Sequence, residues 1–295
     1  KSSQFVTGSK GFPAGMLIYL CIREPGSRNL DTSMSDLALY QYVLIGLIFI
    51  WSGFVRSGLG FGGAVLSLPF LLLVLDDPLV FLPIIAVHLL VFSSLTIWMN
   101  NRKSSGTGDD GAAVVGTVDW HYLWRILAIM IVPKLIGVFG LITLPSEIMS
   151  TIIFVIVSLY SISYILDRPF RSGSRTVDAV FLMVGGYISG TSLIGAPLII
   201  AVVAQHLPKE RLRDTLFALW FILVVIKMAA FIWVGVDLQL IHHLWLLPCA
   251  AIGHVIGLYV HDRMLKAETP IFFRVLGVVL LIVSSIGMAR VLFPG

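Results

Sequence analysis

Two glycine- and proline-rich segments, residues 57–69 and 185–197, interrupt long apolar stretches and could bind an anion. Glycine adopts positive φ without strain, so each segment is expected to bend and then begin a second helical arm. The first backbone amides of a helix lack partners and carry a partial positive charge, which attracts anions. The expected amide donors are those of Gly60, Phe61, Gly62 and Gly63 in the first segment, and of Gly190, Thr191, Ser192 and Leu193 in the second.

The hydroxyls of Ser57, Ser67, Thr191 and Ser192 would add further donors beside these amides. A second interpretation is that the glycines only allow helices to pack closely, as small residues do throughout membrane proteins. That interpretation is favoured for one motif taken alone. Two motifs at matching positions favour a binding site, because paired broken helices are typical of transporter substrate sites.

Ionisable side chains inside apolar stretches are costly to desolvate, and a function is the default hypothesis for them. Lys227 and His254 lie near the middle of their stretches, as does His88, and Lys134 lies nearer one end. We therefore predict that these four residues border the substrate path. The alternatives are that the lysines snorkel to the interface and that the histidines form hydrogen bonds between helices.

Acidic residues are missing from the same stretches, since all 16 lie in loops or near the ends of apolar runs. A binding cage for a coupling cation is therefore not indicated, and the expected interior, amides plus cationic side chains, suits an anion. No nucleotide-binding loop is present, and His242 and His243 lack the spacing of metal ligands. Cys21 and Cys249 indicate neither a disulfide framework nor a metal cluster. No cofactor, metal or catalytic residue is predicted.

The whole composition is that of a membrane protein, with 58% hydrophobic and 12% charged residues and a mean hydropathy of +0.97. Soluble domains carry about 25% charged residues. The net charge of +4 is spread over short loops, as the positive-inside rule requires, so no nucleic-acid partner is expected. Six runs are long enough to cross a bilayer: 81–101, 121–141, 148–166, 215–235, 240–260 and 271–292. Residues 37–75 and 177–206 are the two interrupted stretches.

The chain also repeats itself, because sliding the sequence along itself superposes Pro69 on Pro197 and, at the same shift, Gly62 on Gly190. Basic residues predict that both ends of 177–206 are cytoplasmic, which makes this stretch a re-entrant hairpin. The first hairpin is expected to end outside. The predicted fold is therefore an all-α polytopic membrane protein with two inverted repeats, each a re-entrant or broken helical hairpin plus three transmembrane helices. The repeats are predicted at 36–167 and 176–292, after an extramembrane tail at 1–35.

The two motifs and the spans after them resemble the TauE/SafE family of sulfite and organosulfonate exporters. The resemblance rests on Gly58 to Pro69 with the span from Phe81, and on Gly190 to Pro197 with the span from Thr215. It implies a bacterial inner-membrane permease for sulfite, sulfonates or related organic anions. His88 and Lys227 depart from the small or neutral residues expected in many relatives, so the resemblance leaves the identity of the anion open.

We therefore predict a secondary transporter that exports a small sulfur-containing anion. The anion would be held by the two hairpin tips near the bilayer midplane, with Lys227 adding attraction. An anion channel and an uptake permease for another organic anion are the alternatives, followed by a membrane enzyme or accessory subunit. Beyond the substrate and the lipid bilayer, the sequence leaves open whether the chain forms a homo-oligomer.

Overall fold

The computed structural model describes residue 34 and residues 37–59, 62–104, 118–168, 170–266 and 270–293. Every regular element in this part of the chain is helical. Apart from residue 34, the predicted tail at 1–35, which includes Cys21, lies outside the described residues. Gly60 and Phe61 lie outside them as well.

Among the residues that the structure describes, seven helices are long and apolar enough to cross a bilayer. They are α2 (Leu39–Leu59), α4 (Pro78–Ser104), α5 (Trp120–Thr143), α6 (Ser146–Ile165), α9 (Lys209–Val234), α10 (His243–Lys266) and α11 (Pro270–Leu292). Six of these coincide with the predicted crossings. The seventh, α2, is the first arm of the first interrupted stretch, and its 21 residues rise about 31 Å, close to the thickness of the hydrocarbon core. The first stretch is therefore a full-length helix followed by a short one, not a pair of half-crossings.

Three shorter helices complete the two hairpins: α3 (Gly63–Val74), α7 (Arg175–Ser192) and α8 (Ala196–His206). Helices α3 and α8 have 12 and 11 residues, too few to cross a bilayer. The hydroxyl of Ser174 caps the start of α7 by accepting from the amide of Val177 at 3.3 Å. The open end of the second hairpin is closed by His206 and Asp178, whose side chains are hydrogen-bonded at 2.9 Å.

The breaks in the two hairpins are equivalent, but not in the predicted alignment. The first break follows Leu59 and the second follows Ser192, and each ends where the second arm of its hairpin begins. Gly62 therefore corresponds to Gly195, because each immediately precedes the second arm. The predicted partner, Gly190, lies inside α7. The predicted alignment paired residues of the same type, and it therefore placed the second break earlier in the chain than Gly195, where the structure has it.

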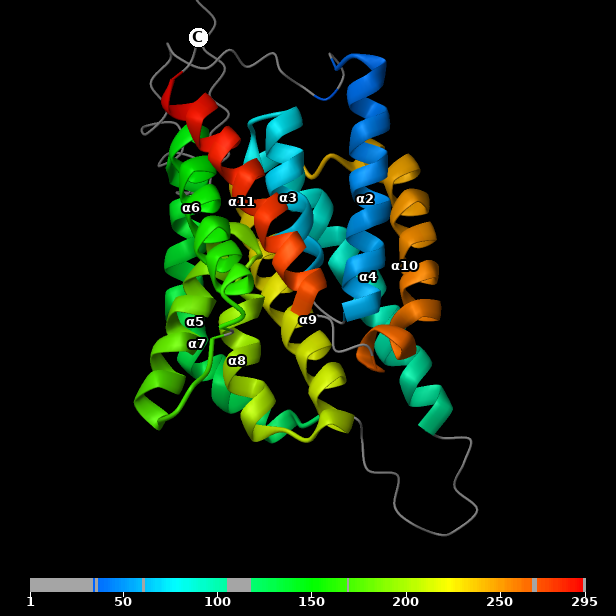
Figure 1. Cartoon of the computed structure of the whole chain (residues 1–295), viewed down its shortest axis with the longest axis vertical. Coiled ribbons are helices and arrows are strands. Elements are labelled where there is room, and N and C mark those ends of the chain that lie inside the picture. The colour runs from blue at the N-terminus through cyan, green and yellow to red at the C-terminus, as the bar shows by residue number, and fades with distance from the viewer. Residues whose placement is uncertain are drawn as a thin grey trace, which may run out of the picture.

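The helices pack in pairs that are preserved when the two five-helix units, α2–α6 and α7–α11, are exchanged. Helix α2 packs on α10 and α7 packs on α5, while α4 packs on α9 and α6 on α11. Helix α2 begins at the upper end of the molecule and α11 ends there, whereas α8 meets α9 at the lower end (Figure 1). This reciprocal packing fits two related halves. Their inverted orientation in the membrane stays a prediction.

Glycines allow the close approach of helices in two of these pairs. A Cβ atom on Gly190 of α7 would collide with the carbonyl oxygen of Lys134 on α5. A Cβ atom on Gly253 of α10 would collide in the same way with the carbonyl oxygen of Ile50 on α2. Helix packing is thus a sufficient reason for a glycine at position 190, as the packing interpretation expects.

Large apolar side chains cover the outside of the helix bundle. Trp233 is 74% exposed, Tyr259 75% and Phe139 62%, on three different helices. Apolar surface on this scale is typical of a bundle surrounded by lipid. With the seven long apolar helices, it makes the chain a multi-pass membrane protein.

Candidate functional site

A small cavity lies between the two breaks. Gly62 and Gly63 line it from the start of α3, and Leu193 and Ala196 line it from the second break. Its volume open to water-sized molecules is about 40 Å³. Since one water needs roughly 10–15 Å³ by this measure, the cavity has room for about three waters or one small polar group.

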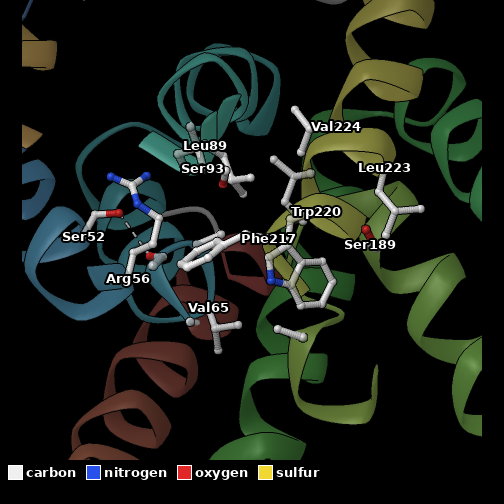
Figure 2. A pocket seen from close by; sticks show the side chains of 16 residues that line it. Ser52, Arg56, Val65, Leu89, Ser93, Ser189, Phe217, Trp220, Leu223 and Val224 are labelled. Atoms are coloured by element: carbon white, nitrogen blue, oxygen red, sulfur yellow. Dashed lines mark hydrogen bonds between the residues drawn. The ribbon is translucent and has the colours of Figure 1, made fainter. Parts of the chain in front are cut away.

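The walls of the cavity come from corresponding positions of the two halves. Leu89 and Ser93 of α4 face it from one side, and Trp220 and Val224 of α9 face it from the other (Figure 2). Counted from the starts of α4 and α9, Leu89 and Trp220 hold the same position, and so do Ser93 and Val224. These walls are mostly apolar. Polar groups in the lining therefore stand out as candidates for holding a ligand.

Arg56 is the charged residue that lines the cavity, and the sequence analysis missed it (Figure 2). The side chain lies in the last turn of α2 and is only 7% exposed. Its Nε and Nη2 atoms have no hydrogen-bond partner among the described residues. The guanidinium carbon sits 4.5 Å from the centre of the Phe92 ring. The rule that selected the lysines, an ionisable residue within an apolar stretch, would also have selected Arg56.

Ser189 occupies the position in α7 that Arg56 occupies in α2, at the same distance along the chain from the second arm of its hairpin. It lines the same cavity. Its hydroxyl oxygen accepts a hydrogen bond from Lys134 Nζ at 3.1 Å. A hydroxyl that accepts in this way keeps its own proton to donate elsewhere, which makes Ser189 a candidate donor to an anion in the cavity.

The start of α3 supplies free amides, of which only that of Gly63 is among the four predicted in the first motif. Gly62 has a φ of 85° and precedes the helix, in a conformation that glycine adopts without strain. By helix geometry the amides of Gly63, Ala64 and Val65 have no carbonyl partner within α3, and all three residues line the cavity. Ser67 is used differently from the prediction, because its hydroxyl donates to the carbonyl of Gly63 at 2.5 Å.

The second motif differs from the prediction. Gly190, Thr191 and Ser192 form the last turn of α7, so their amides are inside a helix rather than at the start of one. The amide of Leu193 is also taken, donating to the carbonyl of Ser189 at 3.3 Å. The expectation of free amides at these four positions is therefore wrong, because the chain breaks after them.

The start of α8 supplies the free amides in the second hairpin. They belong to Ala196 and Leu198, since Pro197 has no N–H. The hydroxyls of Thr191 and Ser192 each donate to the carbonyl of Ile188 at 3.0 Å. These two hydroxyls therefore donate within α7 itself, to a carbonyl near its end.

The two predicted lysines meet at this end of α7 and are both fully buried. Lys134 Nζ also donates to the carbonyl of Ser189 at 3.1 Å, and Lys227 Nζ donates to the carbonyl of Thr191 at 3.2 Å. Neither lysine snorkels, since each amine ends on a carbonyl inside the bundle. Neither is among the residues lining the cavity.

The two predicted histidines, His88 and His254, gather around the ring of Phe92. The ring of His254 lies 4.8 Å from that of Phe92, and its Nδ1 atom is hydrogen-bonded to Ser57 Oγ at 2.5 Å. The ring of His88 lies 6.3 Å from Phe92 and 5.4 Å from His243. Neither histidine is among the residues lining the cavity. His254 forms a hydrogen bond between helices, as the alternative interpretation expects.

Of the predicted site residues, the structure brings Gly62 and Gly63 to the cavity. Lys134, Lys227, Gly190, Thr191 and Ser192 gather at the end of α7, while His88 and His254 gather around Phe92. Ser67 supports the start of α3, and Gly60 and Phe61 lie outside the described residues. In the described part of the chain, no group of three His, Cys, Asp or Glu side chains is placed to hold a metal ion.

Comparison with known families gives one match. Residues 44–288 match the model of the family described as sulfite exporter TauE/SafE. The matched region contains both breaks and every residue of the cavity. No curated protein and no solved structure matches the chain.

Proposed function

The chain belongs to the sulfite exporter TauE/SafE family, and from that premise we propose that it exports a small sulfur-containing oxyanion through the cavity between its two breaks. The carrier acts as a secondary transporter of the bacterial inner membrane and performs no catalysis. Sulfite and short organosulfonates are the proposed substrates. The family supports the proposed export direction and the proposed inner-membrane location.

One observation carries the choice of an anion. The guanidinium of Arg56 lies at the cavity, nearly fully buried, with two nitrogens that have no hydrogen-bond partner among the described residues. An unpaired buried charge is costly, by several kcal/mol on general grounds. An oxyanion in the cavity would remove that cost, because guanidinium donors match the spacing of oxyanion acceptors.

Donors from both halves support the same proposal. On the side of the first hairpin, Arg56 is joined by the free amides at the start of α3, from Gly63 to Val65. On the side of the second, the hydroxyl of Ser189 keeps its proton because its oxygen accepts from Lys134. Helix starts favour an anion by about 0.3–1 kcal/mol each, and more when partly buried. The anion would thus be held between the halves.

The apolar walls define the rest of the substrate. Leu89, Val224, Phe217 and Trp220 offer no charged partner for a second charged group. A single charged headgroup with no tail, as in sulfite, or with a short apolar tail, as in a small sulfonate, fits these surroundings. A substrate with two well-separated charges fits them poorly.

Alternating access follows from a cavity between two related halves. We propose that α4 and α9, which carry matched wall residues, move relative to each other and open the cavity to one side and then the other. A membrane potential negative inside favours the exit of an anion by about 2.3 kcal/mol per charge per 100 mV. Export can therefore proceed without another energy source.

The test is uptake of radiolabelled sulfite and of a short radiolabelled sulfonate into liposomes that contain the purified protein. A potential positive inside is imposed and then reversed. We expect saturable uptake that follows the potential, together with exchange of labelled for unlabelled anion across the membrane. Arg56→Ala should abolish it, whereas Arg274→Ala should not, because Arg274 pairs with Asp167 at an exposed site.

Other outcomes would contradict the proposal in identifiable ways. Flux that does not saturate and lacks exchange would make the protein an anion channel. Full activity in Arg56→Ala would place the anion elsewhere. Absence of flux for both anions, with either sign of potential, would reject them as substrates.

A further inference from the structure

The carbonyl end of α7 is the second polar centre of the bundle. Leu193, with a φ of 61°, ends this helix inside the protein. Its amide donates to the carbonyl of Ser189, and the carbonyls of the last three residues of the helix have no amide partner within it. Such an end carries roughly half an elementary negative charge. In transporters with broken helices, carbonyls at the end of a half-helix commonly coordinate the coupling cation.

Two lysine amines occupy this end of α7. Lys134 comes from α5 and ends on Ser189, and Lys227 comes from α9 and ends on Thr191. Both side chains are fully buried, and none of the ion pairs between described residues includes either of them. The acceptors that balance the two amines are therefore helix carbonyls, the same ligands that a mobile cation would use.

We propose that Lys134 and Lys227 act as tethered cations in the position where a coupling cation would bind. The carrier then needs no sodium ion at this end of α7, and removal of Lys227 leaves a vacancy that a small monovalent cation fills. The expectation that transport needs no sodium ion rests on the proposed function as an anion carrier. The expectation that a cation binds in the vacancy is independent of that function, because cation binding can be measured without flux.

The amines also connect this centre to the cavity. Ser189 is shared, since it lines the cavity and receives both hydrogen bonds of Lys134. Lys227 reaches the neighbouring carbonyl and lies 5.6 Å from the ring of Phe231 on its own helix. A cation held at this end, whether tethered or mobile, thus fixes the hydroxyl that we propose as a donor to the anion. These lysines are positioning residues, not direct ligands.

The test compares thermal unfolding of the detergent-purified wild type and Lys227→Ala in chloride salts of sodium, methylammonium and choline at equal ionic strength. Methylammonium carries the lost amine, and choline is too large to enter the vacancy. The wild type should unfold at one temperature in all three salts. The variant should unfold about 5 °C lower in choline, because the carbonyl of Thr191 at a buried helix end loses a hydrogen bond. It should regain stability, saturably, in sodium or methylammonium.

Lys227→Met serves as the matched control, because its apolar chain fills the space without offering a site, and its unfolding should not respond to the cation. Lys134→Ala carries the same test if Lys227→Ala does not fold. Equal unfolding of the alanine variant in all three salts would overturn the proposal, and so would stabilisation of the wild type by sodium. In liposomes, wild-type flux should be the same in sodium and in choline. Failure of the anion to move at all would reject the proposed substrate but leave the unfolding result standing.

Discussion

The guanidinium of Arg56 lies 4.5 Å from the centre of the Phe92 ring. This contact connects the last turn of α2 to the middle of α4. The aromatic face holds the charge by a cation–π contact and leaves its donors unused. The same ring contacts His254 and His88. Phe92 therefore contacts both Arg56, which lines the cavity, and the two histidines.

Replacement of Arg56 should separate the effect of charge from the effect of shape. Arg56→Lys keeps the charge but loses the fork of donors, and Arg56→Ala loses both. Because a hydrogen bond to a charged group contributes about 1.5–3 kcal/mol, we expect anion affinity to fall roughly ten- to hundredfold in Arg56→Ala and less in Arg56→Lys. Calorimetric titration of sulfite or sulfonate into the wild type and the two variants measures their anion affinities. Equal affinity in all three proteins would contradict it.

Phe92→Leu should weaken anion binding without removing any donor. The loss of a cation–π contact of about 0.5–2 kcal/mol leaves the guanidinium less well oriented, so affinity should fall roughly two- to thirtyfold. The apparent KM for transport reports it. Phe139→Leu is the matched control, since Phe139 is 62% exposed on the lipid-facing side of α5. An unchanged KM in Phe92→Leu would mean that Arg56 is held by other contacts.

Gly190→Ala should destabilise the protein through the packing of α7 on α5. The new Cβ would collide with the carbonyl oxygen of Lys134, which is backbone and cannot move aside cheaply. Overpacking of this kind costs about 1–3 kcal/mol. Gly173→Ala is the control, because a Cβ at that position meets no atom within 4 Å. Unfolding in detergent, followed by circular dichroism, should show a lower midpoint for Gly190→Ala only.

Asp76, in the turn between α3 and α4, predicts a pH dependence of stability. Burial raises the pKa of this carboxyl above the usual 3.8, and the nearby charge of Glu147 raises it further, against the hydrogen bond from Ser150. Because the carboxylate is disfavoured in the folded state, the wild type should lose stability as pH rises through the unfolded and then the folded pKa. Asp76→Asn should escape this loss.

The advantage of Asp76→Asn over the wild type should therefore be absent below about pH 3.5 and grow towards pH 7, as measured by the unfolding midpoint at each pH. Glu147→Gln should reduce the pH dependence of the wild type, since it removes one of the two causes. A difference between Asp76→Asn and the wild type that is constant over this range would contradict the raised pKa.

The sequence by itself determined the class of the protein, six of its seven long apolar helices, and the existence of two interrupted hairpins. These features are local. A run of about 20 apolar residues must be helical in lipid, and a cluster of glycines allows such a run to bend. The free amides at the start of α3 follow from the same local rules, and Gly62 and Gly63 line the cavity. Their role in binding an anion stays a prediction.

Only the tertiary structure decided which side chains meet. Arg56 and Ser189 belong to different halves of the chain, yet they line one cavity, because the packing of whole helices brings the two breaks together. The same packing sends Lys134 and Lys227 to the carbonyl end of α7 rather than into the cavity. The break after Ser192 could not be placed from composition, since Gly190 contributes close helix contact there and not a bend. The reason is general: residue type fixes what a position tolerates, but contacts between distant segments decide which use is made of it.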